Sequence, residues 1–322
     1  MSVFQHTRRR AFSLLAGGGF AVVAGARARA ANRPIRLGTN NIYGVAATLD
    51  INGDDKPSDA VIQLFRFNSV PAMLQALNAG ELDVAEVGEV GPVIAQAADI
   101  PVKTIAATRP WPEGEAIIVH KTSKIQTVRD LVGKKVSYPR ATNAQWLLTK
   151  ALRAEGLKIS DIETVDIPAG TNLLAVLETG GVDASVFIDA SLSQYEAGGA
   201  RRIKNAGDAG CDNSLFFIAS EKIIADDPTS VGVLVRQLHR HLVWARGHQE
   251  IRAKAVADLL RIPPEIALAS ERKRPDGLRP IDAALIANGQ DIANTFLAQK
   301  VIPKSIVVAP TFTTQFNAFI GA

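Results

Sequence analysis

A pattern of residues that returns after one hundred positions is the feature that most limits the fold. It consists of two apolar pairs, a glycine and an apolar residue followed by aspartate: Met73-Leu74, Ala76-Leu77, Gly80 and Leu82-Asp83, then Leu173-Leu174, Val176-Leu177, Gly180 and Val182-Asp183. Pairs at this spacing are typical of one face of a helix, and the glycine is typical of its end. Each copy therefore predicts a helix that turns at glycine into a buried strand. The period is too long for a stack of short repeats and indicates two similar lobes.

Strand patterns and helix patterns alternate along the rest of the chain. We expect strands at 35–39, 61–65, 82–87 and 134–138, and helices at 144–154, 228–243, 250–260, 264–269 and 282–300. This alternation predicts an α/β fold with mostly parallel sheets and helices on both faces. The run Glu271-Arg272-Lys273-Arg274, which precedes Pro-Asp-Gly, is expected to be a solvated surface loop.

An acidic residue follows the predicted strand in both copies of the pattern. Glu89 follows the first strand and Asp189 follows the second. Ligands of open α/β sheets bind outside the carboxyl ends of strands, so the two acids are candidates for opposite walls of a cleft between the lobes. The alternative is that each acid is a turn residue or caps the next helix. Thr142 or Asn143 begins another helix, whose N-terminal N–H groups suit an anion.

The first thirty residues predict an export signal. Arg8-Arg9-Arg10 lies before Phe12 and Leu14, an apolar run follows, and Ala28-Arg29-Ala30 forms a cleavage site of the small-x-small type. The apolar run is shorter than the ~20 residues that span a bilayer. Paired arginines before Phe and Leu are typical of a twin-arginine signal, and an ordinary secretory signal with an extra arginine is the alternative. We expect cleavage after Ala30 and a soluble product in the periplasm.

Charge and cysteine content exclude several function classes. The chain has 36 basic and 32 acidic residues, but five arginines lie in residues 1–30, which leaves 31 basic residues against 32 acidic ones. A basic nucleic-acid interface is therefore not expected. Cys211 is the single cysteine, and the histidines lack the spacing of a zinc site. We expect no metal, no cofactor and a monomer.

Motifs of catalysis are also missing from the sequence. It contains no GxGxxG, P-loop, GxSxG or HExxH, and no nucleophile is placed beside a base. These absences favour a binding protein over an enzyme.

The sequence resembles the taurine, aliphatic sulfonate and nitrate binding proteins of ABC importers. The resemblance runs from about Ile35 to Arg202. It is carried by these segments: Phe67-Asn68-Ser69-Val70-Pro71, Leu77–Val84, Gly88-Glu89-Val90-Gly91-Pro92, Glu115–Val119, Thr127–Val136, and Gly180-Gly181-Val182-Asp183-Ala184 with Asp189. It implies a type II periplasmic binding protein fold, with two lobes that hinge around a cleft, and a membrane permease as partner. It also implies lobe 1 in residues 31–117 and 216–322, and lobe 2 in residues 118–215.

The chain departs from this family at the implied ligand site. Family members often have Trp-Asp-Pro where this chain has Ile188-Asp189-Ala190. They often have a serine pair followed at two residues by His where this chain has Thr142-Asn143 and then Gln145. The taurine type has serines where this chain has Glu89-Val90. Three acids, Glu89, Glu115 and Asp189, would repel an anion, or clasp an amine if ionised. The resemblance thus implies these ligand-binding residues: Tyr43, Gly88, Glu89, Trp111, Glu115, Thr142, Asn143, Gln145 and Asp189.

The implied ligand is a small sulfonate or a taurine-like compound. The anionic end of a taurine-like molecule would meet the amides near Thr142, Asn143 and Gly88–Glu89, and its ammonium would meet the carboxylates. Two alternatives remain open. One is a binder of a pyrimidine or another amine-bearing or aromatic nutrient. The other is an enzyme related to desulfinases, which would need a reactive cysteine or histidine in the cleft.

Overall fold

The structure is a computed structural model that describes residues 33–40, 44–49, 60–167 and 171–321. The chain divides after Arg33, and the compact unit that begins at Pro34 contains all the strands and helices named below. The predicted export signal and the predicted ligand residue Tyr43 lie outside the described residues.

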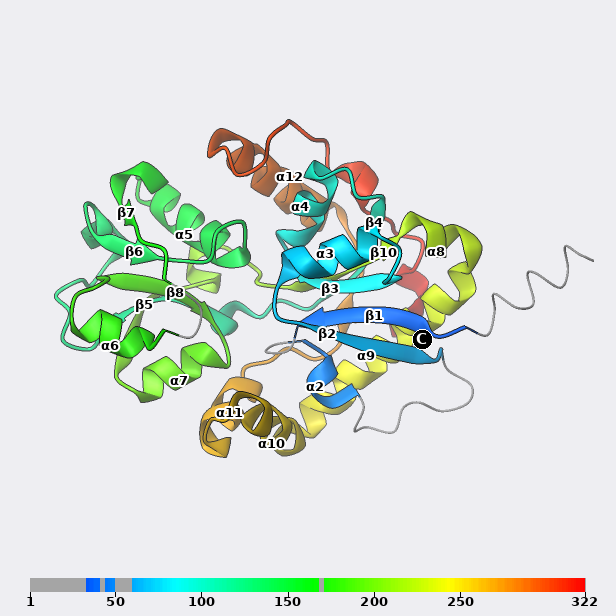
Figure 1. Ribbon diagram of the computed structural model, residues 1–322, viewed down its shortest axis with the longest axis horizontal. Coiled ribbons are helices and arrows are strands. Elements are labelled where there is room, and N and C mark those ends of the chain that lie inside the picture. The colour runs from blue at the N-terminus through cyan, green and yellow to red at the C-terminus, as the bar shows by residue number, and fades with distance from the viewer. Residues whose placement is uncertain (1–32, 41–43, 50–59, 168–170, 322) are drawn as a thin grey trace, which may run out of the picture. The chain divides into compact units, whose positions relative to one another are not determined.

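Two separate sheets organise this unit (Figure 1). Among the described residues, the first sheet has the strand order β11-β4-β10-β3-β1-β2 and the second the order β7-β6-β8-β5-β9. The strands are β1 Ile35–Asn40, β2 Ile62–Phe67, β3 Val84–Gly88, β4 Val102–Thr108, β5 Glu115–His120, β6 Lys135–Ser137, β7 Glu163–Thr164, β8 Ala184–Ile188, β9 Ala200–Asn205, β10 Leu215–Ser220 and β11 Leu278–Arg279. β1 is parallel to β2 and β3, β6 is parallel to β7 and β8, and β10 and β5 are antiparallel to their neighbours. The predicted α/β fold is confirmed, but the prediction of mostly parallel sheets was wrong. Both sheets are mixed, because the strand that follows each crossing, β5 or β10, runs antiparallel to both of its neighbours.

Helices flank both sheets and form the C-terminal third of the chain. They are α2 Ala46–Leu49, α3 Val70–Asn78, α4 Gly91–Ala97, α5 Asn143–Ala154, α6 Leu173–Glu178, α7 Ser191–Ala197, α8 Glu221–Asp226, α9 Pro228–Gly247, α10 Gln249–Leu260, α11 Pro264–Glu271 and α12 Ala283–Ala298. The helices predicted from 144, 228, 250, 264 and 282 all occur, with ends that differ by a few residues. Among the described helices, none has both the length and the apolar character needed to cross a bilayer.

The hundred-residue pattern is confirmed as a repeated structure. In the first copy α3 leads through β3 to α4, and in the second α6 leads through β8 to α7. Gly80 and Gly180 both have φ of 74°, in the left-handed region that glycine enters without strain. The same residue types therefore end both helices and direct both chains into the centre of a sheet.

The aspartate of each copy joins its turn to the neighbouring strand. Asp83 Oδ2 accepts a hydrogen bond from the Arg36 backbone N–H at 2.9 Å, and Asp183 Oδ2 accepts one from the Lys135 backbone N–H at 2.8 Å. The same bond therefore joins the parallel pair β3 and β1 in one sheet and the parallel pair β8 and β6 in the other.

The chain crosses between the two sheets twice. The crossings are 109–114, between β4 and β5, and 206–214, between β9 and β10. All of β5 pairs within the second sheet and all of β10 pairs within the first. Lobe 1 here means the first sheet with its helices, and lobe 2 means the second sheet with α5, α6 and α7. The predicted lobe boundaries after residues 117 and 215 stay a prediction. The pairing of the strands places the two crossings just before β5 and just before β10.

Alternating side chains of the two antiparallel strands fill the cores. Phe216 of β10 packs with side chains of α3, α4 and α12, while Phe217 packs with α9 on the other face. In β5, Ile117 packs with α5 and Ile118 with α6. Burial of each such side chain contributes roughly 1.5–3 kcal/mol, so both sheets are anchored at the strand that follows a crossing.

The segment after α11 departs from the prediction of a solvated loop. Glu271 is buried, Arg274 lies over the ring of Trp111, and Lys273 pairs with Asp189 of lobe 2. The prediction was wrong because opposite charges and an aromatic face, distant in sequence, compensate the burial of this charged run. The helices α10 and α11 pack against each other, and α11 also packs against α7 of lobe 2.

Candidate functional site

The turn after β3 meets the start of α5 from the other lobe. Asn143 Oδ1 accepts a hydrogen bond from the Val90 N–H at 3.3 Å, and Asn143 Nδ2 donates to Asn213 Oδ1 at 3.4 Å. A Cβ on Gly88 would lie 2.4 Å from Asn143 Oδ1, so glycine permits this approach. The structure therefore brings two predicted residues, Gly88 and Asn143, together at facing strand ends.

Glu89 lies beside this contact and is 1% exposed. Its Oε1 accepts from the Asn213 N–H at 3.2 Å, and its Oε2 accepts from Asn288 Nδ2 at 2.9 Å. Burial raises the pKa of Glu89 to about 7, and the nearby charge of Asp212 also raises it, although the donors on Asn288 and Asn213 act in the opposite direction. The carboxyl group therefore changes charge near neutral pH.

Glu115 begins β5 and is also buried. Burial, and then the charge of Glu89, raise the pKa of Glu115 well above its usual value. Its Oε2 has no hydrogen-bond partner among the residues that the structure describes. Both shifts favour the protonated acids, which weakens the interpretation of Glu89 and Glu115 as an ionised clasp for an amine.

Asp189 is fully buried and has two partners of its own. Its Oδ1 accepts from the Ser193 N–H at 2.7 Å, and its Oδ2 lies 3.3 Å from Lys273 Nζ. The side chain thus accepts an N–H from the first turn of α7 and also pairs with a cation, although the N-cap position itself is Ala190 rather than Asp189. That cation comes from the protein itself.

Trp111 stands in the first crossing, where Arg274 lies over its ring and Gly114 packs against it. The guanidinium carbon of Arg274 is 4.3 Å from the ring centroid, and a Cβ on Gly114 would lie 2.2 Å from the ring. The Trp111 carbonyl accepts a hydrogen bond from Asn213 Nδ2 at 3.0 Å. A ligand that uses this ring as a wall would have to share it with Arg274.

The remaining predicted residues are engaged away from Trp111. The Thr142 hydroxyl donates to the Pro139 carbonyl at 2.7 Å. Gln145 Oε1 accepts from the Ala141 N–H, and Gln145 Nε2 donates to Gln299 Oε1 at 2.9 Å. Gln145 therefore joins lobe 2 to the segment after α12 rather than joining the group around Asp189. These assignments, like that of Tyr43, stay predictions.

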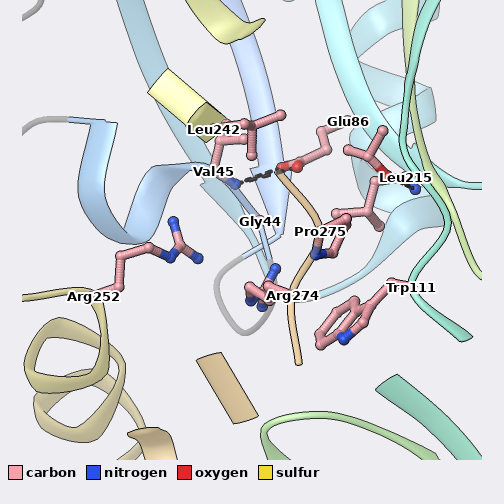
Figure 2. Close-up of a pocket in the computed structure, with 10 residues that line it drawn as sticks. Gly44, Val45, Glu86, Trp111, Leu215, Leu242, Arg252, Arg274 and Pro275 are labelled. Carbon is pink, nitrogen blue, oxygen red and sulfur yellow. Dashed lines mark hydrogen bonds between the residues drawn. The ribbon is translucent and has the colours of Figure 1, made fainter. Parts of the chain in front are cut away.

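Sequence reasoning missed two arginines that share one acid, the buried Arg252 and the partly buried Arg274. Figure 2 shows Arg252 of α10 and Arg274 near Glu86 of β3. Arg252 Nε donates to Glu271 Oε2 at 2.6 Å, and Arg274 Nε donates to Glu271 Oε1 at 2.9 Å. Burial alone would raise the pKa of Glu271, but the charges of Arg274 and Arg252 hold that pKa below its usual value. Little in the sequence indicated this group, because a charged run before Pro-Asp-Gly is typical of a solvated surface loop.

Glu86 completes the acidic side of this group. The Thr39 hydroxyl donates to Glu86 Oε2 at 2.5 Å, and the Val45 N–H donates to the same oxygen at 3.0 Å. Burial raises the pKa of Glu86, against the opposing effects of these donors and of Arg274 and Arg252. Cations, an aromatic face and a carboxyl group thus converge at the carboxyl end of the first sheet.

A cavity of about 20 Å³ lies among these side chains. Its lining includes Gly44, Val45, Glu86, Thr108, Trp111, Leu215, Leu242, Arg252, Arg274 and Pro275. This volume suits about one water molecule and is far below the roughly 300 Å³ of a small-molecule pocket. Binding here therefore requires the lobes, or the segment that carries Arg274, to move.

Comparisons with known proteins agree with this architecture. Residues 68–251, more than half of the chain, match the family described as NMT1/THI5 like. An aliphatic sulfonates-binding protein of Escherichia coli strain K12 is 30% identical over 254 residues, which are 77% of this chain and 78% of that protein.

Solved structures of sulfonate-binding proteins share the fold. The periplasmic aliphatic sulphonate binding protein SsuA from Escherichia coli has 25% identity and a TM-score of 0.79, over 89% of this chain and 99% of that one. The alkanesulfonate-binding protein SsuA from Xanthomonas axonopodis pv. citri, bound to MOPS, has 26% identity and a TM-score of 0.76, over 87% and 98%. A desulfurization enzyme, DSZB, shares the fold alone, at 16% identity and a TM-score of 0.64 over 89% and 98%.

Proposed function

Because the chain belongs to the NMT1/THI5-like family, together with aliphatic sulfonate-binding proteins, we propose that it is the solute-binding component of an ABC importer. It is a periplasmic protein that binds a small sulfonate by lobe closure and presents it to a membrane permease. The observation that carries the proposal is the group of polar contacts where the strand ends of two similar lobes face each other.

An anion fits the chemistry of this region better than a neutral solute does. Arg274 is held over Trp111 by Glu271, and a guanidinium donates paired hydrogen bonds to oxyanions. The N-terminus of the twelve-residue helix α5, at Asn143, offers N–H groups and the positive end of a helix dipole from the other lobe. A sulfonate held from both sides would favour the closed arrangement.

Catalysis is not part of the proposal. Cys211 is buried, and burial followed by the charge of Glu89 raises the pKa of its thiol far above the usual value. A cysteine nucleophile needs the thiolate, which this environment disfavours. Across the residues that the structure describes, no group of three or more His, Cys, Asp or Glu side chains could hold a metal ion for an alternative mechanism.

A thermal-shift screen tests the proposed function. Ethanesulfonate, taurine, nitrate, a pyrimidine and benzoate would each be added to the purified protein. A ligand at about 100 times its Kd adds about 2.7 kcal/mol of stability, so a sulfonate should raise Tm by several degrees. Arg274→Gln should reduce the shift, whereas Arg129→Gln, which changes an exposed arginine of lobe 2, should retain it. Stabilisation by uncharged compounds alone would contradict the proposal.

A further inference from the structure

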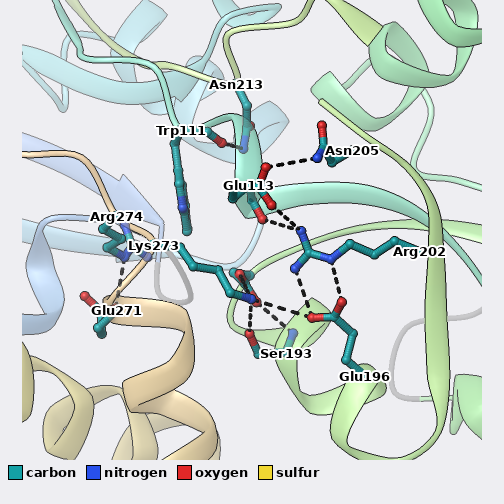
Figure 3. A network of polar contacts seen from close by, with 11 residues as sticks. Trp111, Glu113, Ser193, Glu196, Arg202, Asn205, Asn213, Glu271, Lys273 and Arg274 are labelled. Atoms are coloured by element: carbon teal, nitrogen blue, oxygen red, sulfur yellow. Dashed lines mark hydrogen bonds and ion pairs between the residues drawn. The ribbon is translucent and has the colours of Figure 1, made fainter. Parts of the chain in front are cut away.

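The side chain of Lys273 joins the segment after α11 to lobe 2. Its Nζ lies 3.3 Å from Asp189 Oδ2, 3.0 Å from Ser193 Oγ and 3.6 Å from Glu196 Oε2 (Figure 3). Asp189 is 0% exposed, while the Lys273 side chain is 26% exposed. The carboxylate therefore has a cation partner that reaches it from the side open to solvent.

The ammonium of Lys273 lies at the carboxyl end of β8, beside Asp189. Arg274, the next residue, lies over the Trp111 ring, and Gly114 packs against that ring. The Asp189 N–H donates to the Gly114 carbonyl at 2.8 Å, so Asp189 and Trp111 are held close to the same short segment. A ligand that enters between Trp111 and lobe 2 would meet Asp189 already paired.

The acids around Lys273 already form ion pairs with cations of the protein. Glu196, its third acceptor, also forms an ion pair with Arg202, with Nε 2.5 Å from Oε1. Arg202 Nη1 in turn lies 3.2 Å from Glu113 Oε2. Each of the three acids, Asp189, Glu196 and Glu113, thus has a cation partner, Lys273 or Arg202, that the chain itself supplies.

We infer that the ammonium of Lys273 occupies the position beside Asp189 that the ammonium of a zwitterionic ligand would need. Lys273 thereby makes the protein select sulfonates that carry no amine. This inference rests on the proposed function and narrows its ligand class. A taurine molecule would bring its ammonium next to the ammonium of Lys273. The taurine ammonium would then lose its hydration water without gaining a carboxylate partner. Ethanesulfonate has the same sulfonate and carbon chain and carries no such cost.

Calorimetric titration with ethanesulfonate and with taurine tests the inference. The wild-type protein should bind ethanesulfonate at least about tenfold more tightly than taurine, since juxtaposed like charges are strongly unfavourable. Lys273→Met leaves Asp189 without its lysine, so the ammonium of taurine can pair with Asp189. The preference for ethanesulfonate over taurine should therefore fall at least about tenfold. Lys273→Arg should keep the wild-type preference. Lys222→Met, which removes an exposed lysine that pairs with Asp226 in the same helix, should change neither affinity.

Two results would overturn the inference and leave the proposed function intact. One is a wild-type protein that binds taurine as tightly as ethanesulfonate, or more tightly. The other is a Lys273→Met protein that keeps the wild-type preference. If the Met variant does not fold by circular dichroism, Lys273→Gln, which can still donate to Ser193, replaces it with the same expectation. Failure of both sulfonates to bind the wild-type protein would instead refute the proposed function itself.

Discussion

Glu89 makes a prediction about stability and pH that can be worked out from the structure. Its pKa rises from 4.5 to about 7 because the carboxyl group is buried, next to the charge of Asp212. Between these two values the folded protein holds a proton that the unfolded chain releases. The stability that this proton provides is fully present below pH 4.5 and is lost as the pH rises through 7. This difference between the two pKa values corresponds to about 3 kcal/mol.

The measurement is the free energy of unfolding in urea, for the wild-type protein and for Glu89→Gln, from pH 4.5 to 8. The glutamine cannot ionise, so the stability of the variant relative to the wild type should increase by up to about 3 kcal/mol across this range. The comparison with the variant is needed because burial lowers the pKa of His241 to about 3, which makes wild-type stability rise with pH between 3 and 6.5. Glu81→Gln, at an exposed position, should give a difference that is flat with pH. A flat difference for Glu89→Gln as well would refute the reasoning about burial.

Three further predictions concern other parts of the chain. Arg252→Met should lower the free energy of unfolding by roughly 3–5 kcal/mol, because it leaves the buried Glu271 without one of its two arginines; a loss below about 1 kcal/mol in urea would contradict this. Gly88→Ala should cost about 1 kcal/mol by displacing Asn143 from Val90, and should cost much less in an Asn143→Ala background, which double-mutant unfolding measurements would reveal. N-terminal sequencing of the exported protein should begin at Ala31, and an intact Met1 in the cytoplasm would refute the predicted signal.

The repeated architecture could be predicted from local sequence. Helix periodicity and the glycines Gly80 and Gly180 depend on neighbours a few residues away, and the structure uses them as predicted. The bonds of Asp83 and Asp183 to the neighbouring strands join residues 47 and 48 positions apart, and no role was predicted for these aspartates. The order of strands within a sheet needed the family resemblance, because β10 inserts between β3 and β4 from more than one hundred residues away.

The candidate site could be predicted only in part. Gly88, Glu89, Asn143 and Asp189 were found because they follow strands or begin helices, and those places are visible in sequence. The role of Lys273 and Arg274 could not be found, because it depends on partners 84 residues away at Asp189 and on the ring of Trp111. A charged run has the same local pattern whether distant partners compensate it or water does.

The central claim, that a small sulfonate binds between the two lobes, is tested most directly by a crystal structure with 2-bromoethanesulfonate. The anomalous signal of bromine locates the ligand without reference to any assumed site. We expect a single strong peak between the two sheets, near Trp111 and Arg274 on one side and the start of α5 on the other. A peak on an outer surface, or no peak at a saturating concentration of the ligand, would contradict the claim.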